Sequence, residues 1–185
     1  MSPSALSCRE WGMVGGGTSL TDVDETEGMS MQNLPRGATG FWDATAGPAP
    51  SVDVKAFRAA CYEAARVTSA EVRSFTRPQG STPNFYTAVL SYRTGPVAVV
   101  CHVILPLLAT AWPPAADDSG PLSFIDVEQL APVLSQIPHF RLLSASELRQ
   151  PLARVDLSRL GDGEREQVRY WQPETVGAML FNYWD

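Results

Sequence analysis

The side chains in this sequence that come closest to a catalytic pair are Cys101 and His102, which are adjacent. Nucleophilic catalysis by cysteine needs a thiolate beside a base. Both residues lie in the apolar run VAVVCHVIL at 97–105, which predicts a central β-strand whose successive side chains point to opposite faces of the sheet. A catalytic pair would therefore have to join Cys101 to His139, the only other histidine. Cysteines in such runs usually act as small buried hydrophobic residues, so we expect a structural role and keep a site of Cys101, His102 and His139 as the alternative.

The spacing of potential metal ligands argues against a metal centre. His102 and His139 are too far apart in sequence to form a spacing that specifies zinc or iron. The three cysteines, Cys8, Cys61 and Cys101, are odd in number and contain no CxxC pair, which argues against a disulfide framework or a structural zinc site. The sequence also lacks a GxSxG elbow, an HExxH motif and a phosphate-binding GK[ST] loop. We therefore expect no metal and no cofactor.

Composition limits both the class of protein and the class of partner. The chain has 185 residues and 44% hydrophobic composition, enough for the core of one ordinary domain. Its net charge of −6 argues against nucleic acid or an anionic membrane as the partner, because phosphate binding needs clustered Lys and Arg. The longest apolar run, 97–112, is broken by His102 and Pro106 and is shorter than the roughly 20 residues of a membrane span. No secretory signal follows Met1, so we expect a cytoplasmic protein.

Periodicity divides the chain in two. Residues 1–50 are rich in Gly, Ser, Thr and Pro without periodicity, which predicts a flexible N-terminal tail, and residues 51–185 are expected to form a single α+β domain. The domain begins with a long amphipathic helix from Asp53 to about Ser69. Strands are expected at three segments: 71–77, 85–93 and 97–105. This order of elements favours a mostly antiparallel sheet. Ser144 with Glu147 indicates a capped helix further along the chain.

The C-terminal stretch RYWQPETVGAMLFNYWD is too apolar and aromatic for a disordered tail. Pro173 suits the first turn of a helix, because its fixed φ and missing N–H are tolerated there. The apolar residues that follow recur at helical spacing: Val176, Met179, Leu180 and Tyr183. The pattern predicts a strand that ends at residues 170–171, followed by a C-terminal helix packed on the sheet.

The same stretch has a second interpretation, as a surface that binds a partner. Trp, Tyr and Arg dominate the binding hot spots of protein interfaces. The residues expected to present this surface are Tyr170, Trp171, Asn182, Trp184 and Asp185. Core packing and recognition are compatible here, because a helix has two faces.

The pattern YWxPxTxGxxxFNxWD, which runs from Tyr170 to Asp185, resembles the ending of small bacterial proteins, some of them from toxin–immunity loci. The resemblance covers this C-terminal stretch alone, and it implies a compact intracellular protein that acts by binding a partner. An acidic chain would suit inhibition of a basic toxin such as a nuclease, through charge complementarity. We therefore expect an intracellular protein-binding or accessory protein of the immunity type. The alternatives are a small enzyme with a scattered Cys/His site and a subunit of a larger assembly.

Overall fold

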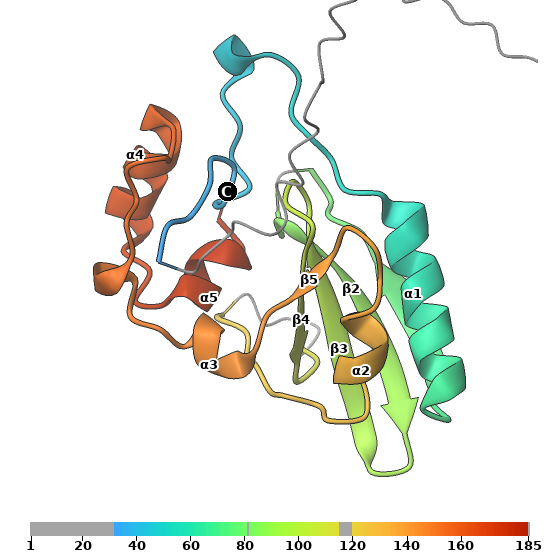
Figure 1. Ribbon diagram of the computed structural model, residues 1–185. Coiled ribbons are helices and arrows are strands. Elements are labelled where there is room, and N and C mark those ends of the chain that lie inside the picture. The colour runs from blue at the N-terminus through green and yellow to red at the C-terminus, as the bar shows by residue number, and fades with distance from the viewer. Residues whose placement is uncertain (1–31, 81, 115–119, 185) are drawn as a thin grey trace, which may run out of the picture.

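A computed structural model describes residues 32–80, 82–114 and 120–184 of the chain. Most of the expected tail, residues 1–31, lies outside these ranges. The described elements, in chain order, are η1 (Ala44–Ala46), α1 (Val54–Val67), β1 (Glu71–Thr76), β2 (Phe85–Tyr92), β3 (Gly95–His102), β4 (Leu107–Ala111), α2 (Ala131–Leu134), β5 (Arg141–Leu142), α3 (Ala145–Leu148), η2 (Leu152–Arg154), α4 (Asp162–Trp171) and α5 (Val176–Leu180). Figure 1 shows their arrangement, and the α+β class expected from the sequence is confirmed.

The five strands form one sheet in the order β1-β2-β3-β4-β5. Neighbouring strands are antiparallel from β1 to β4, and only β4 and β5 are parallel. β2 and β3 form the central hairpin, which pairs Phe85 with His102 at one end and Tyr92 with Gly95 at the other. Gly95 has a φ of 133°, a backbone conformation that side chains with a Cβ rarely adopt. The prediction of a mostly antiparallel sheet is therefore confirmed.

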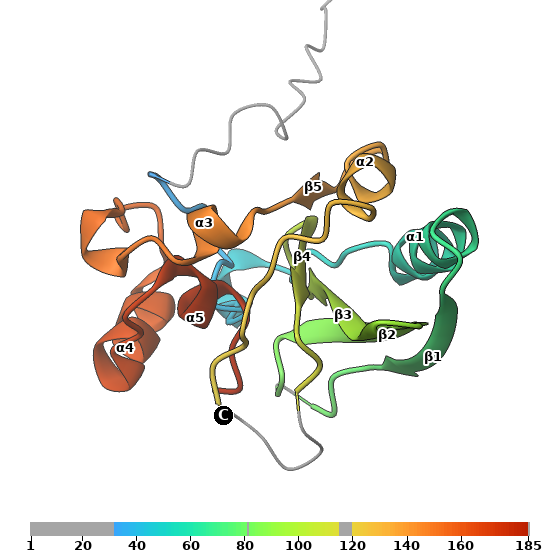
Figure 2. The ribbon, with the colours of Figure 1, turned by 90° about the horizontal axis from the view of Figure 1, so that it is seen from below.

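Helices cover both faces of the sheet, as the view in Figure 2 shows. α1 and α2 pack on one face, where Val97, Val99 and Cys101 of β3 meet the buried stripe of α1. α3 and α5 cover the other face, over Val100 of β3 and the strand β4. Successive residues of β3 thus enter two separate hydrophobic clusters, which accounts for its apolar sequence on both sides.

Helix α1 occupies the segment for which the sequence predicts an amphipathic helix. The Asp53 carboxylate caps its first turn by accepting hydrogen bonds from the N–H groups of Lys55 and Ala56. Phe57 and Cys61 lie fully buried on the face that contacts the sheet. A buried side chain of the size of Phe57 contributes about 1.5–3 kcal/mol to the free energy of unfolding, so this face anchors the helix.

The strand expected to end at Tyr170 and Trp171 does not exist, because both residues belong to the last turn of α4. The residues before them include good helix formers, and the helix continues until Gln172 adopts a left-handed conformation with a φ of 48°. The C-terminal helix α5 is present, as expected, but it begins after Thr175, whose side chain caps it, rather than at Pro173. Val176, Met179 and Leu180 of this helix are fully buried, and Phe181, which follows it, packs against the ring of Phe85 in the sheet core.

The expected tail boundary at residue 50 differs from the structure, because Leu34 and Ala38 are fully buried in the core. The Glu164 carboxylate of α4 holds this segment by accepting hydrogen bonds from the N–H of Gly37 at 2.9 Å and from the N–H and hydroxyl of Thr39. The Gly161 N–H, at the start of α4, donates to the same carboxylate. These partners come from a distant part of the chain, so composition alone could not reveal that the segment is ordered.

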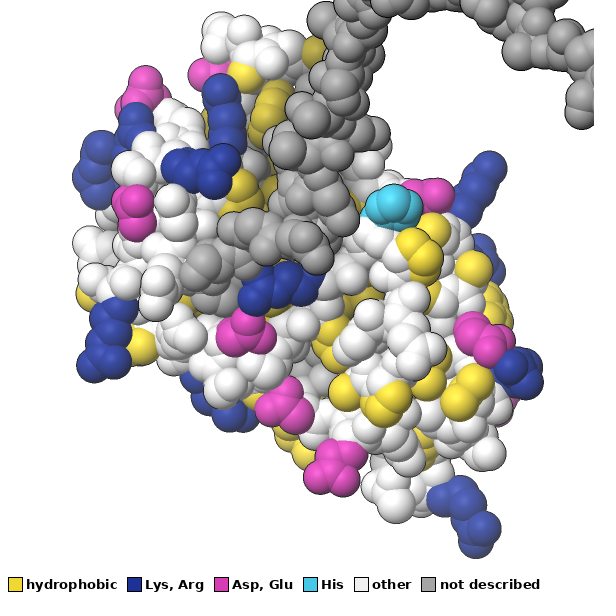
Figure 3. Space-filling model, viewed as in Figure 1, with side chains coloured by type: hydrophobic (Ala, Val, Ile, Leu, Met, Phe, Trp, Pro, Cys, Tyr) yellow, Lys and Arg dark blue, Asp and Glu magenta, His cyan; other side chains and the backbone are white. Residues whose placement is uncertain are grey.

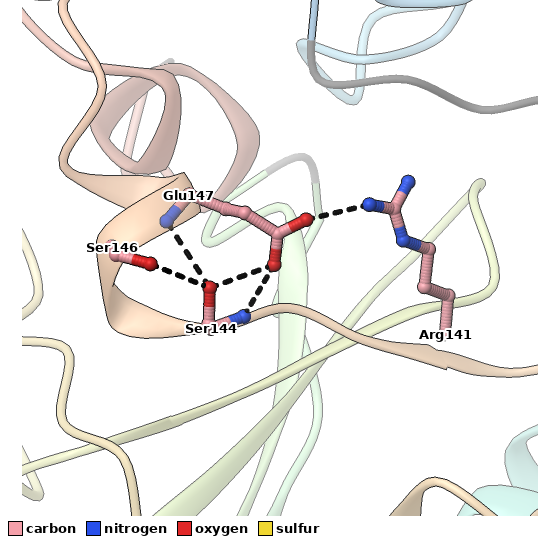
Figure 4. A network of polar contacts seen from close by, with 4 residues as sticks. All are labelled: Arg141, Ser144, Ser146 and Glu147. Carbon is pink, nitrogen blue, oxygen red and sulfur yellow. Dashed lines mark hydrogen bonds and ion pairs between the residues drawn. The ribbon is translucent and has the colours of Figure 1, made fainter.

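The capped helix expected from Ser144 and Glu147 is α3, and Figure 4 shows its polar contacts. The Glu147 N–H donates to the Ser144 hydroxyl, and the Ser144 N–H donates to the Glu147 carboxylate. The Arg141 guanidinium donates to the same carboxylate at 2.6 Å. Partial burial raises the pKa of Glu147, but the bonds from Ser144 and the Arg141 charge outweigh it and hold this pKa below its ordinary value. The network is accounted for as a capping box with an ion pair.

Candidate functional site

Cys101 is fully buried between the sheet and α1, and its thiol donates to the backbone carbonyl of His102. Burial, and secondarily the neighbouring Cys61, raise the pKa of the Cys101 thiol well above its ordinary range. Burial also raises the pKa of Cys61, to about 12. Both cysteines therefore carry their protons at neutral pH, so neither presents a thiolate to a substrate.

His102 points to the opposite face of the sheet from Cys101, as the strand pattern predicts, and packs against Phe181. Its Nδ1 accepts hydrogen bonds from the N–H groups of Ile104 and Leu105 at 3.1 and 3.0 Å, so this nitrogen carries no proton. Complete burial lowers the pKa of His102 to about 4, although a backbone hydrogen bond with Ala38 opposes this effect. His102 is a neutral core histidine that ties β3 to the following loop.

His139, the other member of the alternative catalytic site, is exposed and has a φ of 66°. It lines a surface cleft, whereas Cys101 lies in the interior, and no hydrogen bond joins the two among the described residues. The structure therefore does not assemble Cys101, His102 and His139 into one site. Within the described ranges no three His, Cys, Asp or Glu side chains come together in a group that could hold a metal ion.

Three exposed aromatic side chains and the half-buried Trp184 gather instead on α4 and on the residues beside it. We call the set Phe41, Tyr170, Trp171 and Trp184 the aromatic surface. Tyr170 is 78% exposed and Trp171 is 38% exposed, although they end a helix that packs on the core. The rings of Trp171 and Trp184 are stacked, with centroids 6.1 Å apart and an angle of 6° between their planes. Tyr170 meets Trp171 edge-on at 5.1 Å.

The positions of these rings follow from helix geometry and from one glycine. Residues 163, 167, 170 and 171 lie on the same side of α4, because residues three, four and seven apart share a helix face. The ring of Phe41, which is 43% exposed, rests on Gly163, where an added Cβ would collide with it. Gln167 accepts a hydrogen bond from the Trp171 indole N–H at 3.1 Å. The aromatic surface thus extends along two turns of α4.

The C-terminal segment after α5 places Trp184 against Trp171. The Thr82 hydroxyl donates to the Trp184 carbonyl at 2.6 Å, and the Trp184 N–H donates to the Asn182 side-chain oxygen at 3.1 Å. Asn182 itself is only 4% exposed, and its amide group donates to the carbonyls of Thr39 and Met179. Asn182 therefore supports the aromatic surface from within rather than belonging to it.

Of the five residues expected to bind a partner, the structure brings Tyr170, Trp171 and Trp184 together at the surface and buries Asn182. Asp185 lies outside the described residues. Phe41 was not expected there, because it comes from the segment assigned to the tail. The signal in the sequence was the adjacent pair Phe41 and Trp42, two aromatic residues in an otherwise weakly patterned segment.

No protein-family model, curated protein or solved structure matches this chain. Among the described residues, no helix is both long enough and apolar enough to cross a membrane. On the face drawn in Figure 3, acidic and basic side chains are interspersed, without a continuous basic area of the kind that tracks a nucleic-acid backbone. Exposed aromatic rings remain the feature with a clear capacity for recognition.

Proposed function

We propose that this protein acts by binding another protein through the aromatic surface. The observation that carries the proposal is the stacked pair Trp171 and Trp184 with the largely exposed Tyr170 beside it. Single exposed apolar residues are common on monomeric proteins, but adjoining exposed aromatic rings mark sites of interaction. Tyr and Trp are also the residues that most often dominate the energetics of protein interfaces.

The rings are held in place before any partner arrives. Trp171 is fixed by stacking on Trp184 and by the hydrogen bond from its indole N–H to Gln167. Trp184 is in turn anchored through its backbone to Thr82 and Asn182. Binding would therefore immobilise few additional side chains, which lowers the entropic cost of association.

Charge favours a basic partner. The chain carries a net charge of −6, which attracts a cationic protein at long range. At short range, the faces of Tyr and Trp rings attract Lys and Arg side chains of a partner by cation–π interaction. The C-terminal pattern supports an immunity-like role, in which the protein inhibits a basic toxin in a bacterial cytoplasm.

The test compares two tyrosine variants of the full-length chain. Tyr170→Ala removes the most exposed ring of the aromatic surface. Tyr62→Ala is the matched control, because Tyr62 is a 50% exposed tyrosine on α1, which covers the opposite face of the sheet. Both side chains are so exposed that their removal should leave the melting temperature nearly unchanged, which a thermal melt checks. Each variant and the unaltered protein serve as bait in a lysate of the native host, followed by quantitative mass spectrometry.

The expected result is a protein that the unaltered chain and Tyr62→Ala retain equally and that Tyr170→Ala loses. With the purified partner, Tyr170→Ala should weaken the dissociation constant by at least about tenfold, as truncation of a hot-spot residue does. Equal retention by all three baits would contradict the proposal. Light scattering of the purified chain tests the assembly alternative: a dimer that Tyr170→Ala dissociates would assign the aromatic surface to self-association instead.

A further inference from the structure

A cleft of about 750 Å³ opens where the segment leading into α1 meets two loops of the other half of the chain. One wall is formed by residues 35–36, 42 and 50–53, and the other by the β3–β4 loop at 104–106 and by residues 138–140. Its volume lies within the range of small-molecule sites in proteins, roughly 300–1,000 Å³. The residues that matter for its chemistry are Arg36, Trp42, Asp53, Leu105, Phe140 and Arg159.

Two guanidinium groups line this cleft. The Arg36 guanidinium lies over the ring of Trp42, with its central carbon 5.1 Å from the ring centroid. It also lies close to Gly161, where an added Cβ would be 3.3 Å from the Arg36 Nε. The missing side chain of Gly161 thus leaves room for the guanidinium plane. No carboxylate in the described part of the chain forms an ion pair with Arg159. Both residues line the cleft, and the planar fork of an arginine side chain is well suited to binding an anion.

The acidic groups nearby are already engaged. Asp53 lines the cleft, but its carboxylate caps α1 by accepting from two backbone N–H groups. Asp43 is near enough to Arg36 to be influenced by it, yet hydrogen bonds from Thr45 contribute more than the Arg36 charge to the lowered pKa of Asp43. The cleft therefore combines two arginines, the His139 imidazole and one occupied carboxylate with an apolar lining, in a protein whose overall charge is negative.

We propose that this cleft binds a small anion that has an apolar ring and carries a phosphate or a carboxylate. The anionic group pairs with Arg159 and Arg36, and the ring lies against the apolar lining that includes Leu105 and Phe140. This site is separate from the protein-binding role proposed for the aromatic surface, since the two share none of their residues.

Calorimetric titration of the full-length chain with three naphthalene probes tests the proposal. 1-Naphthyl phosphate and 1-naphthoate carry the two candidate anionic groups, and 1-naphthol offers the same ring without a charge at neutral pH. Arg159→Gln and Arg36→Gln each remove one cation of the cleft. Arg93→Gln is the matched control, because Arg93 is an exposed arginine in the β2–β3 turn, at the opposite end of β3 from the cleft. Circular dichroism confirms that all three variants fold.

We expect at least one anionic probe to bind at a single site and 1-naphthol to bind about tenfold more weakly or not at all, because its neutral hydroxyl cannot form an ion pair with a guanidinium group. Arg159→Gln should weaken binding of the anion by about tenfold, and Arg93→Gln by less than about twofold. A preference between phosphate and carboxylate identifies the anionic group of the natural ligand. The proposal is overturned if neither anion binds at millimolar concentration, if 1-naphthol binds equally well, or if Arg159→Gln and Arg36→Gln both leave binding unchanged.

Discussion

Acid should destabilise this protein through His102, and the effect can be isolated by replacing that residue with asparagine. Its Nδ1 accepts two backbone N–H groups, so protonation would place a third N–H against them in a fully buried site. Asparagine keeps an acceptor oxygen near the position of Nδ1 but does not titrate in this range. The comparison therefore removes the proton without removing the acceptor.

The magnitude follows from the pKa of His102, which is about 4 in the folded chain against the ordinary histidine value of 6.5. Because the folded pKa is lowered, the unfolded chain binds more protons between these two values. The contribution to stability is thus fully present above about pH 6.5 and is lost as the pH falls toward about 4. The difference between the two pKa values corresponds to about 3 kcal/mol in the free energy of unfolding. About 1 kcal/mol of this should be lost when the pH falls from about 7.5 to about 5.5.

Urea denaturation followed by tryptophan fluorescence measures this loss. Carboxylates also titrate over part of this range, so the informative quantity is the difference in free energy of unfolding between the unaltered protein and His102→Asn at each pH. That difference should shrink by about 1 kcal/mol when the pH is lowered from about 7.5 to about 5.5. The slope of the free energy of unfolding against urea concentration should stay the same. His139→Asn, which removes the exposed histidine at a position of positive φ that asparagine tolerates, should follow the unaltered protein. A His102→Asn variant with the same pH dependence as the unaltered protein would refute the reasoning.

Three further results are expected. Glu164→Gln should lower the free energy of unfolding by about 1–3 kcal/mol in urea denaturation, because an amide replaces a buried carboxylate whose oxygens accept four hydrogen bonds; an unchanged midpoint would contradict the role assigned to it. Gly177→Ala should cost about 1–3 kcal/mol in the same assay, because the new Cβ would lie 2.5 Å from the buried ring of Phe124; a more stable variant would show that the ring moves freely. Cys61 and Cys101 should react with a thiol reagent only after unfolding, as peptide-resolved mass spectrometry can show; rapid native labelling of Cys101 would restore the enzyme alternative.

The sequence by itself determined those helices and strands whose side chains follow a local pattern over a few neighbouring residues. The stripe of α1, the doubly apolar strand β3 and the capping pair Ser144 and Glu147 each carry their signal within a few neighbouring positions. Such local signals record which face of an element is buried or how a helix end satisfies its N–H groups, and both follow from short-range geometry. The buried, structural interpretation of Cys101 and His102 followed from the same alternation.

Only the tertiary structure decided which residues meet across the chain. The aromatic surface brings Phe41 together with residues of α4 and with Trp184. Phe41 lies more than a hundred positions before α4 and Trp184 in the sequence. Likewise, the order of the segment near residue 38 depends on Glu164, which a local pattern cannot indicate. Tyr170 and Trp171 favour strands by their side chains but end a helix, because the capped first turn and the docking of α4 outweigh the preference of two residues. These features depend on packing between residues that are far apart in the sequence. A short window of sequence does not contain both partners of such a contact, so it cannot indicate the free energy that the contact contributes.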